Sequence, residues 1–591
     1  MKKKMVIWLL TLAMAVSTVA GCGASNETAP ASDTATAVDY AASETYDDVE
    51  YEPAAESPAE APSTSEQSAS KKSGMRNDST ISFNSAATAE SEAWYDNTYD
   101  YKGYDIPDAS GEDYTVNEEN GFFNVMESPL STFAADVDTA SYSNMRRFVN
   151  EGYGLYDFPA GSIRAEELIN YFKYDYAAPK NGDRFGVDAQ VSDCPWNKNN
   201  KLMILGVNTK ELKEKNRPDS NIVFLLDVSG SMSSANKLPL LKDAMELLAD
   251  NLTENDRVSI VTYASGTDVI IDGVSGDQTN KINRAFEKLK AGGSTNGEGG
   301  IELAYEIAQE NFIKGGNNRV ILATDGDFNV GKCKGDDLKE LISEKKETGV
   351  FLSVLGFGMG NYSDTTAETL ADAGNGNYAY IDSIKEAKKV LVDEMSSTLY
   401  TVAKDTKLQV EFNPALVKEY RLIGYENRAL AAQDFTDDTK DGGELGAGHQ
   451  VTAVYEIRLA DSRDTNSDLK YQDNVISDKG WSKDEWCTLS IAFKDPDKNE
   501  SQYMEFPIGA NNYTSKPSED FMFATSVAEY AMALTDSEYL VDMTREEAID
   551  QAIKNVKKID PDDEYKQEFL GRYGNGLRHS KQRCMVRIRI A

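Results

Sequence analysis

Residues 222–231 read Ile-Val-Phe-Leu-Leu-Asp-Val-Ser-Gly-Ser, an apolar run that ends in one carboxylate and two hydroxyls. A short, continuous apolar run bounded by polar residues is typical of a strand that is buried on both faces. Such a strand presents Asp227, Ser229 and Ser231 together at its carboxyl end. Because open α/β sheets keep their ligand crevice at that end of the strands, the segment predicts both a fold class and the position of a site.

Similar polar chemistry recurs in two later segments. Thr295 lies in Gly-Gly-Ser-Thr-Asn, residues 292–296, and Asp325 lies in Leu-Ala-Thr-Asp-Gly, residues 322–326. All-oxygen ligands suit a hard cation such as Mg²⁺. The alternative is that Asp227 and Ser229 cap the following helix and that Asp325-Gly is a turn. We predict a metal site, because capping does not explain all three segments. Its ligands are Asp227, Ser229, Ser231, Thr295 and Asp325.

This five-part pattern resembles the metal-ion-dependent adhesion site (MIDAS) of von Willebrand factor type A domains, which reads Asp-x-Ser-x-Ser, then Thr, then Asp before Gly. The resemblance implies that Ser229, Ser231 and Thr295 bind the cation through hydroxyls. It implies that Asp227 and Asp325 bind it directly or through water. The cation would be Mg²⁺, with Mn²⁺ or Ca²⁺ as alternatives, and a Glu or Asp of a partner protein would complete its coordination.

Strand and helix patterns alternate from Asn221 to about Leu399, which predicts a doubly wound, mostly parallel sheet of the von Willebrand A or Rossmann-like kind. We assign this domain to residues 216–400. The expected strands are Ile222–Leu226, Val258–Tyr263, Val269–Ile271, Val320–Ala323, Leu352–Phe357 and Tyr378–Ile381. The expected helices are Leu238–Leu252, Thr279–Leu289, Gly299–Phe312, Asp336–Lys346, Asp364–Ala373 and Ile384–Leu399.

Two flanking regions surround this domain, 116–215 before it and 401–591 after it. The pattern of the first flanking region predicts helices at Asn144–Asn150 and 163–172, followed by strands at Phe185–Val191 and Leu202–Val207. The second is β-rich and carries a helix at Phe521–Leu534. Two strands alone do not form a stable sheet. We therefore expect the early strands to pair with the late ones, so that the α/β domain is inserted into one β-sandwich.

Two short pieces of the first flank resemble a bacterial lipoprotein branch of von Willebrand A-domain proteins. They are Asp-Val-Asp-Thr-Ala-Ser-Tyr, residues 136–142, and Cys-Pro-Trp-Asn, residues 194–197. Asp136 and Asp138 could suggest a second metal site. We favour instead a turn whose carboxylates cap a helix.

The N-terminus has the pattern of a targeting signal. Three lysines precede an apolar segment, Met5–Ala20, which is short for a membrane span and ends in Val-Ala-Gly-Cys at Cys22. By resemblance to bacterial lipoprotein signals, residues 1–21 are a signal peptide and Cys22 is lipidated, with palmitate among its acyl chains. This would anchor an extracytoplasmic protein to the cell membrane. An ordinary signal peptide or a membrane anchor is the alternative.

Residues 22–115 form an acidic linker. From residue 23 on it holds 20 acidic and 4 basic side chains, so it buries too little apolar surface to order itself and should be a disordered tether. The whole chain of 591 residues carries 61 Lys+Arg against 99 Asp+Glu, a net charge of −38. Such a charge repels nucleic acid, which we exclude as a partner.

Histidine is scarce, and the enzyme motifs that we sought are absent. His449 and His579 are the two histidines, and neither sits in a recognisable motif. The chain has no Walker-type phosphate loop and no nucleophile elbow. We expect that the protein is not an enzyme.

The other cysteines, Cys194, Cys333, Cys487 and Cys584, form no Cys-x-x-Cys pair and no zinc spacing. One disulfide is possible in an exported protein, but incidental thiols are the favoured interpretation. Residues 572–591 hold six basic side chains and no acidic one. This tail is either the product of a shifted reading frame or a variant end, or it is a genuine basic arm. We assign it no function.

Three functions remain. The first is a cell-envelope lipoprotein that binds a protein partner through a Mg²⁺-dependent adhesion site. The second is a scaffold whose metal mainly stabilises the fold. The third and weakest is a hydrolase, which would need a nucleophile and a base in the same crevice.

Overall fold

A computed structural model describes residues 111–570, apart from 181, 213–216, 296, 327–334, 361, 441, 462–475, 483, 497, 499 and 560. Several sequence predictions therefore lie outside the described residues. They concern the signal peptide with Cys22, the linker up to residue 110, Cys333, His579, Cys584 and the tail 572–591.

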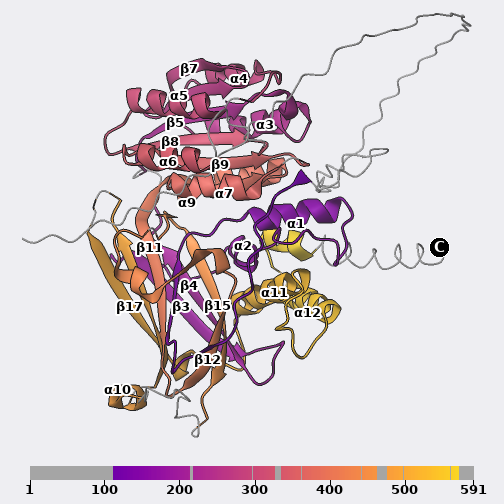
Figure 1. Cartoon of the computed structure of the whole chain (residues 1–591), viewed down its shortest axis with the longest axis vertical. Helices are drawn as coiled ribbons and strands as arrows, with labels where there is room; N and C mark the ends of the chain where they lie inside the picture. Colours follow the sequence, from indigo (N-terminus) through magenta and orange to yellow (C-terminus); the bar gives the residue numbers. More distant parts are fainter. Residues whose placement is uncertain are drawn as a thin grey trace, which may run out of the picture. The chain divides into compact units, whose positions relative to one another are not determined.

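A six-stranded sheet forms the centre of the α/β domain, residues 220–400, in the order β10-β9-β8-β5-β6-β7 (Figure 1). All neighbours are parallel except β6 and β7, which are antiparallel. The predicted mostly parallel sheet is confirmed. Its strands are β5 (Ser220–Asp227), β6 (Arg257–Tyr263), β7 (Thr267–Ser275), β8 (Asn317–Thr324), β9 (Phe351–Phe357) and β10 (Tyr378–Ile381). Its first helices are α3 (Leu238–Ala249), α4 (Thr279–Glu287), α5 (Gly297–Glu310), α6 (Gly335–Lys346) and α7 (Asp364–Ala373).

Strand β5 explains why this sheet is covered on both faces. Every residue of β5 is buried. Its side chains alternate between two apolar cores, with Phe224 and Leu226 in one and Val223 and Leu225 in the other. Helices α3 and α4 contribute to the first core, and α5, α6 and α7 to the second. The continuous apolar run of the sequence thus reflects burial on two sides.

The last helical segment of the domain differs from its prediction. One continuous helix over Ile384–Leu399 is wrong, because a π-helical turn, Lys389–Asp393, separates α8 (Ile384–Lys388) from α9 (Met395–Leu399). The backbone N–H of Glu394 donates to the carbonyl of Lys389 across 2.8 Å. The same spacing of five residues places Lys389 Nζ 2.7 Å from Glu394 Oε1. This ion pair fits a π turn better than an α-helix, whose neighbours are three or four residues apart.

The two flanks fold together as a β-sandwich. One sheet has the order β1-β12-β15-β4-β3, and the other has β13-β2-β11-β16-β17 with β14 beside β11. Early strand β4 pairs with late strand β15, and early β2 with late β11, which confirms the expected insertion. Strands β1, β2, β13, β14 and β17 were not predicted. The bounds are β1 (Phe123–Asn124), β2 (Leu130–Ala134), β3 (Phe185–Asp193), β4 (Lys201–Thr209), β11 (Thr401–Phe412), β12 (Val417–Ile423), β13 (Ala429–Leu430), β14 (Leu445–Gly446), β15 (Gln450–Leu459), β16 (Glu485–Lys494) and β17 (Ser501–Gly509).

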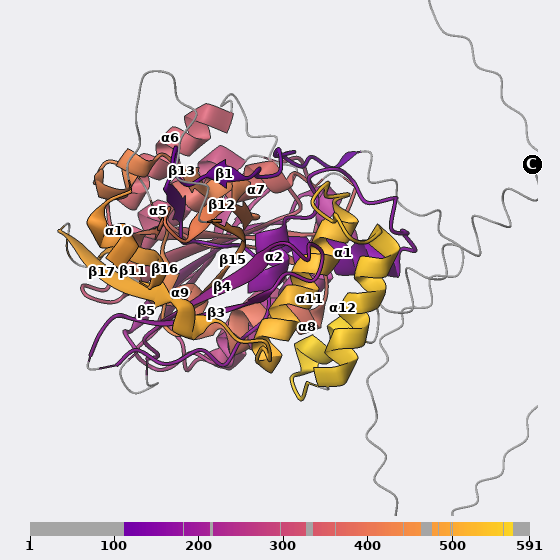
Figure 2. The same cartoon turned by 90° about the horizontal axis from the view of Figure 1, so that it is seen from below.

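Helices cover the outer face of the first sheet. In β4, Met203 and Leu205 point into the sandwich core, whereas Leu202 and Ile204 join a core built with α2 and α11. Figure 2 shows α11 and α12 lying side by side. The flanking helices are α1 (Ala140–Asn150), α2 (Ala165–Asn170), α10 (Asp478–Ser482), α11 (Glu519–Leu534) and α12 (Arg545–Ile559). Among the helices of the described residues, none combines the length and apolar character that a membrane crossing requires.

Three buried arginines join the α/β domain to the flanks, and we call this contact the seam. Arg146 of α1 binds Asp382, Glu386 at 2.6 Å and Glu568 at 3.1 Å. The other two carry comparable networks. Arg164 binds Glu167, Asp364 and Glu368 within 2.9 Å, and Arg428 binds Asp138 at 2.8 Å and Glu368 at 3.3 Å. Each arginine therefore meets at least two carboxylates.

Candidate metal site

Asp227 and Asp325 lie at the carboxyl edge of two adjacent strands. Asp227 is the last residue of β5, and Asp325 directly follows β8. The two strands are parallel, with Leu226 opposite Ala323, so both carboxylates emerge at the same edge. Both residues are fully buried. Their proximity shows in the pKa of Asp227, which the negative charge of Asp325 helps to raise.

The loop after β5 brings the two serines beside Asp227. The backbone N–H of Ser229 donates to Asp227 Oδ1 across 2.8 Å, and Ser229 Oγ lies 2.9 Å from Ser231 Oγ. A 3-10 turn, Gly230–Ser233, follows, while α3 starts later and has Lys237 as its N-cap residue. Neither Asp227 nor Ser229 therefore caps α3. Ser229 is the N-cap residue of the 3-10 turn, where its side chain makes no capping hydrogen bond.

The loop that carries Thr295 docks on the same turn. Gly292 N donates to the carbonyl of Val228 at 2.8 Å, and Gly230 N donates to the carbonyl of Gly293 at 3.0 Å. Gly293 has a φ of +91°, a left-handed conformation that favours glycine. Thr295, two residues further on, is half-buried. The three predicted segments therefore meet at one edge of the sheet.

One carboxylate oxygen at this edge is poorly satisfied by the described residues. Asp227 Oδ2 is buried and makes no well-formed hydrogen bond with any described residue. Burial raises the pKa of Asp227 to about 6, and hydrogen bonds from Ser229 oppose the rise, with a weak contribution from the Tyr263 hydroxyl. A buried carboxylate oxygen without a partner costs free energy. A bound cation would remove that cost, and hydroxyl and carboxylate oxygens suit a hard divalent ion. The residues present fit such an ion.

Lys237 is a polar residue of the site that the sequence did not single out. Its Nζ donates to Asp325 Oδ2 at 2.9 Å, and both side chains are buried. A single lysine in a polar loop before a helix carries no distinctive pattern. Tyr263 and Phe357, the last residues of β6 and β9, are both fully buried.

Asp138 serves the seam and does not form a second metal site. Its Oδ2 accepts from Arg428 at 2.8 Å, and its Oδ1 accepts from the backbone N–H of Tyr378 at 3.0 Å. Thr139 is the N-cap residue of α1, and no side chain forms a capping hydrogen bond there. The preferred interpretation of Asp138 as a helix-capping carboxylate is therefore wrong, because Asp138 is an ion-pair partner between domains.

The two described cysteines are free thiols. Cys194 and Cys487 are both buried, and they belong to different apolar cores. Burial raises the pKa of each thiol. This agrees with incidental thiols for these two residues.

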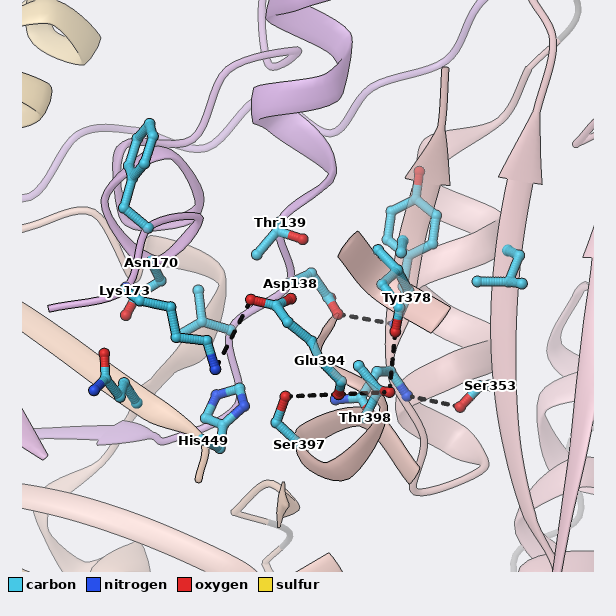
Figure 3. A pocket seen from close by; sticks show the side chains of 17 residues that line it. Asp138, Thr139, Asn170, Lys173, Ser353, Tyr378, Glu394, Ser397, Thr398 and His449 are labelled. Carbon is cyan, nitrogen blue, oxygen red and sulfur yellow. Dashed lines mark hydrogen bonds and ion pairs between the residues drawn. The ribbon is translucent and has the colours of Figure 1, made fainter. Parts of the chain in front are cut away.

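A small cavity of about 70 Å³ lies at the seam (Figure 3). Its walls come from both domains and include Asp138, Lys173, Glu394 and His449. Lys173 Nζ lies 3.9 Å from a carboxylate oxygen of Glu394, and His449 Nε2 is buried without a hydrogen-bond partner among the described residues. Burial, aided by the positive charges of Lys173 and Lys389, lowers the pKa of His449 to about 4. The imidazole is therefore neutral and weakly basic near pH 7.

Comparison with known proteins places three family descriptions along the chain. "von Willebrand factor" matches residues 108–204, "von Willebrand factor type A domain" matches 221–393, and "Uncharacterized protein YfbK, C-terminal" matches 397–572. A solved von Willebrand factor type A protein from Catenulispora acidiphila has a TM-score of 0.39 and 14% identity, and covers 66% of this chain and 89% of its own.

Two curated relatives extend the comparison. Uncharacterized protein sll0103 of Synechocystis is 29% identical over 224 residues, or 36% of this chain and 51% of that protein. Uncharacterized protein YfbK of Escherichia coli (strain K12) is 42% identical over 465 residues, which cover 77% of this chain and 80% of that protein. The chain therefore belongs to the YfbK family of von Willebrand factor type A domain proteins, with a flanking region on each side of the A domain.

Proposed function

We propose that this protein is a lipid-anchored cell-envelope protein that binds a protein partner through a divalent cation at Asp227, Ser229, Ser231, Thr295 and Asp325. The observation that carries the proposal is the buried Asp227 Oδ2, which makes no well-formed hydrogen bond with any described residue, at an edge where the two serine hydroxyls lie 2.9 Å apart. Proteins with von Willebrand type A domains often mediate protein binding. Mg²⁺ is the cation that we favour, because it tolerates a mixed shell of hydroxyls, carboxylates and water.

The charge of the chain favours a metal-bridged contact. At −38 the protein repels an acidic partner at long range. A divalent ion at short range reverses that repulsion locally, because a carboxylate of the partner can bind an open coordination position. Salt screens the long-range repulsion far more than a direct metal–carboxylate bond. Association should therefore be faster at moderate ionic strength than at low ionic strength.

The chain's own residues have distinct roles in this proposal. The neutral hydroxyls of Ser229, Ser231 and Thr295 would hold the ion without cancelling its charge. Asp227 and Asp325 would orient it at the sheet edge. Because few direct carboxylates leave the ion electron-poor, it retains attraction for the acidic side chain of a partner.

Replacing Asp227 by alanine tests the proposal. We expect Asp227→Ala to abolish Mg²⁺ uptake and partner capture together, since it removes the buried ligand oxygens. Isothermal titration measures the first, and pull-down from cell envelopes with and without EDTA measures the second. The exposed Asp243→Ala on α3 is the matched control, because Asp243 makes no ion pair with a described residue. Unchanged metal affinity in Asp227→Ala contradicts the site.

Chelation separates adhesion from the scaffold alternative. If EDTA removes partner binding but hardly changes the melting temperature, the metal serves recognition. A large fall in melting temperature would support a fold-stabilising metal. We propose no catalytic role for the metal site. The histidine that could act as a base, His449, lines the seam cavity instead.

A further inference from the structure

Lys237 places a positive charge inside the candidate metal site. Its ammonium lies 2.9 Å from Asp325 Oδ2, and its side chain is 8% exposed while that of Asp325 is fully buried. An ammonium that shares a buried site with carboxylates neutralises part of their charge before any metal arrives. Asp227 and Asp325 emerge at the same edge of the adjacent parallel strands β5 and β8, so the charge of Lys237 acts on the electrostatics of both carboxylates.

The fold makes room for the aliphatic stem of Lys237. A Cβ atom built on Gly358 would lie 2.2 Å from Lys237 Cε and 2.6 Å from its Cγ. Gly358 also has a φ of +82°, which favours glycine. The hydroxyl of Tyr380 donates to the carbonyl of Gly358 and fixes that turn. The lysine is therefore packed in a defined path toward Asp325, unlike a surface lysine that moves in solvent.

We propose that Lys237 is an internal counter-cation that competes with the divalent ion and sets a weak, reversible metal affinity. The proposal rests on the proposed function, because it assigns a role toward the same cation. Without metal, the ammonium would keep Asp325 in place and limit carboxylate repulsion. With metal, the two positive charges repel at short distance in a partly dry site. Cation binding must then displace the ammonium or tolerate it.

The competing possibility is that Lys237 only positions Asp325 as a ligand. These two roles predict opposite effects on affinity. If Lys237 competes, its removal strengthens cation binding and weakens the metal-free fold. If Lys237 positions Asp325, its removal weakens cation binding.

The test uses the full chain with Lys237→Met, which keeps a stem of similar length beside Gly358 and removes the charge. We expect Mg²⁺ and Mn²⁺ to bind at least about tenfold more tightly by titration calorimetry. We also expect the metal-free melting temperature to fall and added Mg²⁺ to restore it. Lys281→Met on α4 is the control, because Lys281 is exposed and makes no ion pair with a described residue.

A second variant covers the case in which Lys237→Met does not fold. Lys237→Gln lacks the charge but can donate one hydrogen bond to Asp325, and we expect the same rise in affinity. Equal or weaker binding in a folded variant, with wild-type binding intact, overturns the role of Lys237 alone. If neither the wild type nor the uncharged variants take up Mg²⁺ or Mn²⁺, the metal site itself is refuted.

Discussion

The seam and the candidate metal site both bury charge, but they balance it in opposite ways. At the seam, Arg146 meets three carboxylates and Arg164 meets three more, all within 3.1 Å. At the sheet edge, the ammonium of Lys237 contacts Asp325, and one oxygen of Asp227 has no well-formed partner among the described residues. One region has its buried charges paired, whereas the other is short of positive charge.

This difference separates structure from function. Arginine and carboxylates form bidentate, directional contacts, and a network of them fixes how two surfaces meet. Binding of a further ion at the seam would therefore release little free energy. An edge with a surplus of negative charge is less stable by itself, and it gains free energy when a cation arrives. The seam therefore holds the domains together, and the sheet edge is where we propose that a cation binds.

The largest effect should come from breaking the seam. Arg146→Met removes the cation that Asp382 and Glu386 share and leaves Glu568 with Lys385, at 2.6 Å, as its remaining cation. We expect a loss of about 3–5 kcal/mol in unfolding free energy. Denaturant unfolding of the full chain measures it. The exposed Arg257→Met on β6, which makes no ion pair with a described residue, is the control. A loss of under about 1 kcal/mol, typical of a surface ion pair, would erase the contrast between the two regions.

His449 should give the seam a pH dependence. Its folded pKa of about 4 lies below the ordinary 6.5, so the unfolded chain binds more protons between these values. Stability is therefore full above pH 6.5 and falls as the pH drops toward 4, by about 3 kcal/mol in all. The charged groups that face this imidazole are Lys173, Lys389 and Glu394. A substitution of His449 alone leaves them unchanged.

The measurement compares wild type with His449→Gln, because many other groups also titrate in this range. The difference in unfolding free energy between pH 7 and pH 4.5 isolates the imidazole. A wild type and variant with the same slope would show that the seam tolerates the charged ring.

Thr295→Ala should have the smallest effect. Thr295 is half-buried and would supply one neutral oxygen to the ion. We expect a loss of about tenfold in Mg²⁺ affinity, or about 1.4 kcal/mol, with no change in metal-free stability. The loss should be greater for the partner-bound cation than for the free one. Mg²⁺ titration with and without the partner measures this difference. A loss of stability without a loss of Mg²⁺ affinity would show that Thr295 supports the fold and is not a ligand.

Local periodicity sufficed for much of the fold. The strand of residues 222–226 and the alternation around it could be predicted, because burial on two faces leaves a continuous apolar run. The insertion could be predicted because the early strands lacked partners. The five site residues share the carboxyl edge of the sheet, as a parallel arrangement requires. Whether they bind metal stays a prediction.

Other features depend on contacts that no local pattern contains. Arg146 and Asp382 are 236 residues apart, and nothing near either residue marks the other. Asp138 resembled a capping residue because its partners, Arg428 and Tyr378, are distant in the chain. The π turn at Lys389 interrupts a helical pattern that propensity alone continues. Lys237 becomes informative only when the structure places Asp325 beside it.

The insertion has a consequence for biosynthesis. Strand β4 carries Val207, whose partner on β15 is Val451, about 240 residues later. At ~5–20 residues per second, ribosomes need roughly 10–50 seconds to deliver that partner. The α/β domain can complete its own sheet in the meantime. The apolar edges of β2 and β4 stay unpaired until their partner strands, β11 and β15, have been synthesised. Nascent chains should therefore depend on a chaperone that shields these edges until the last strands emerge.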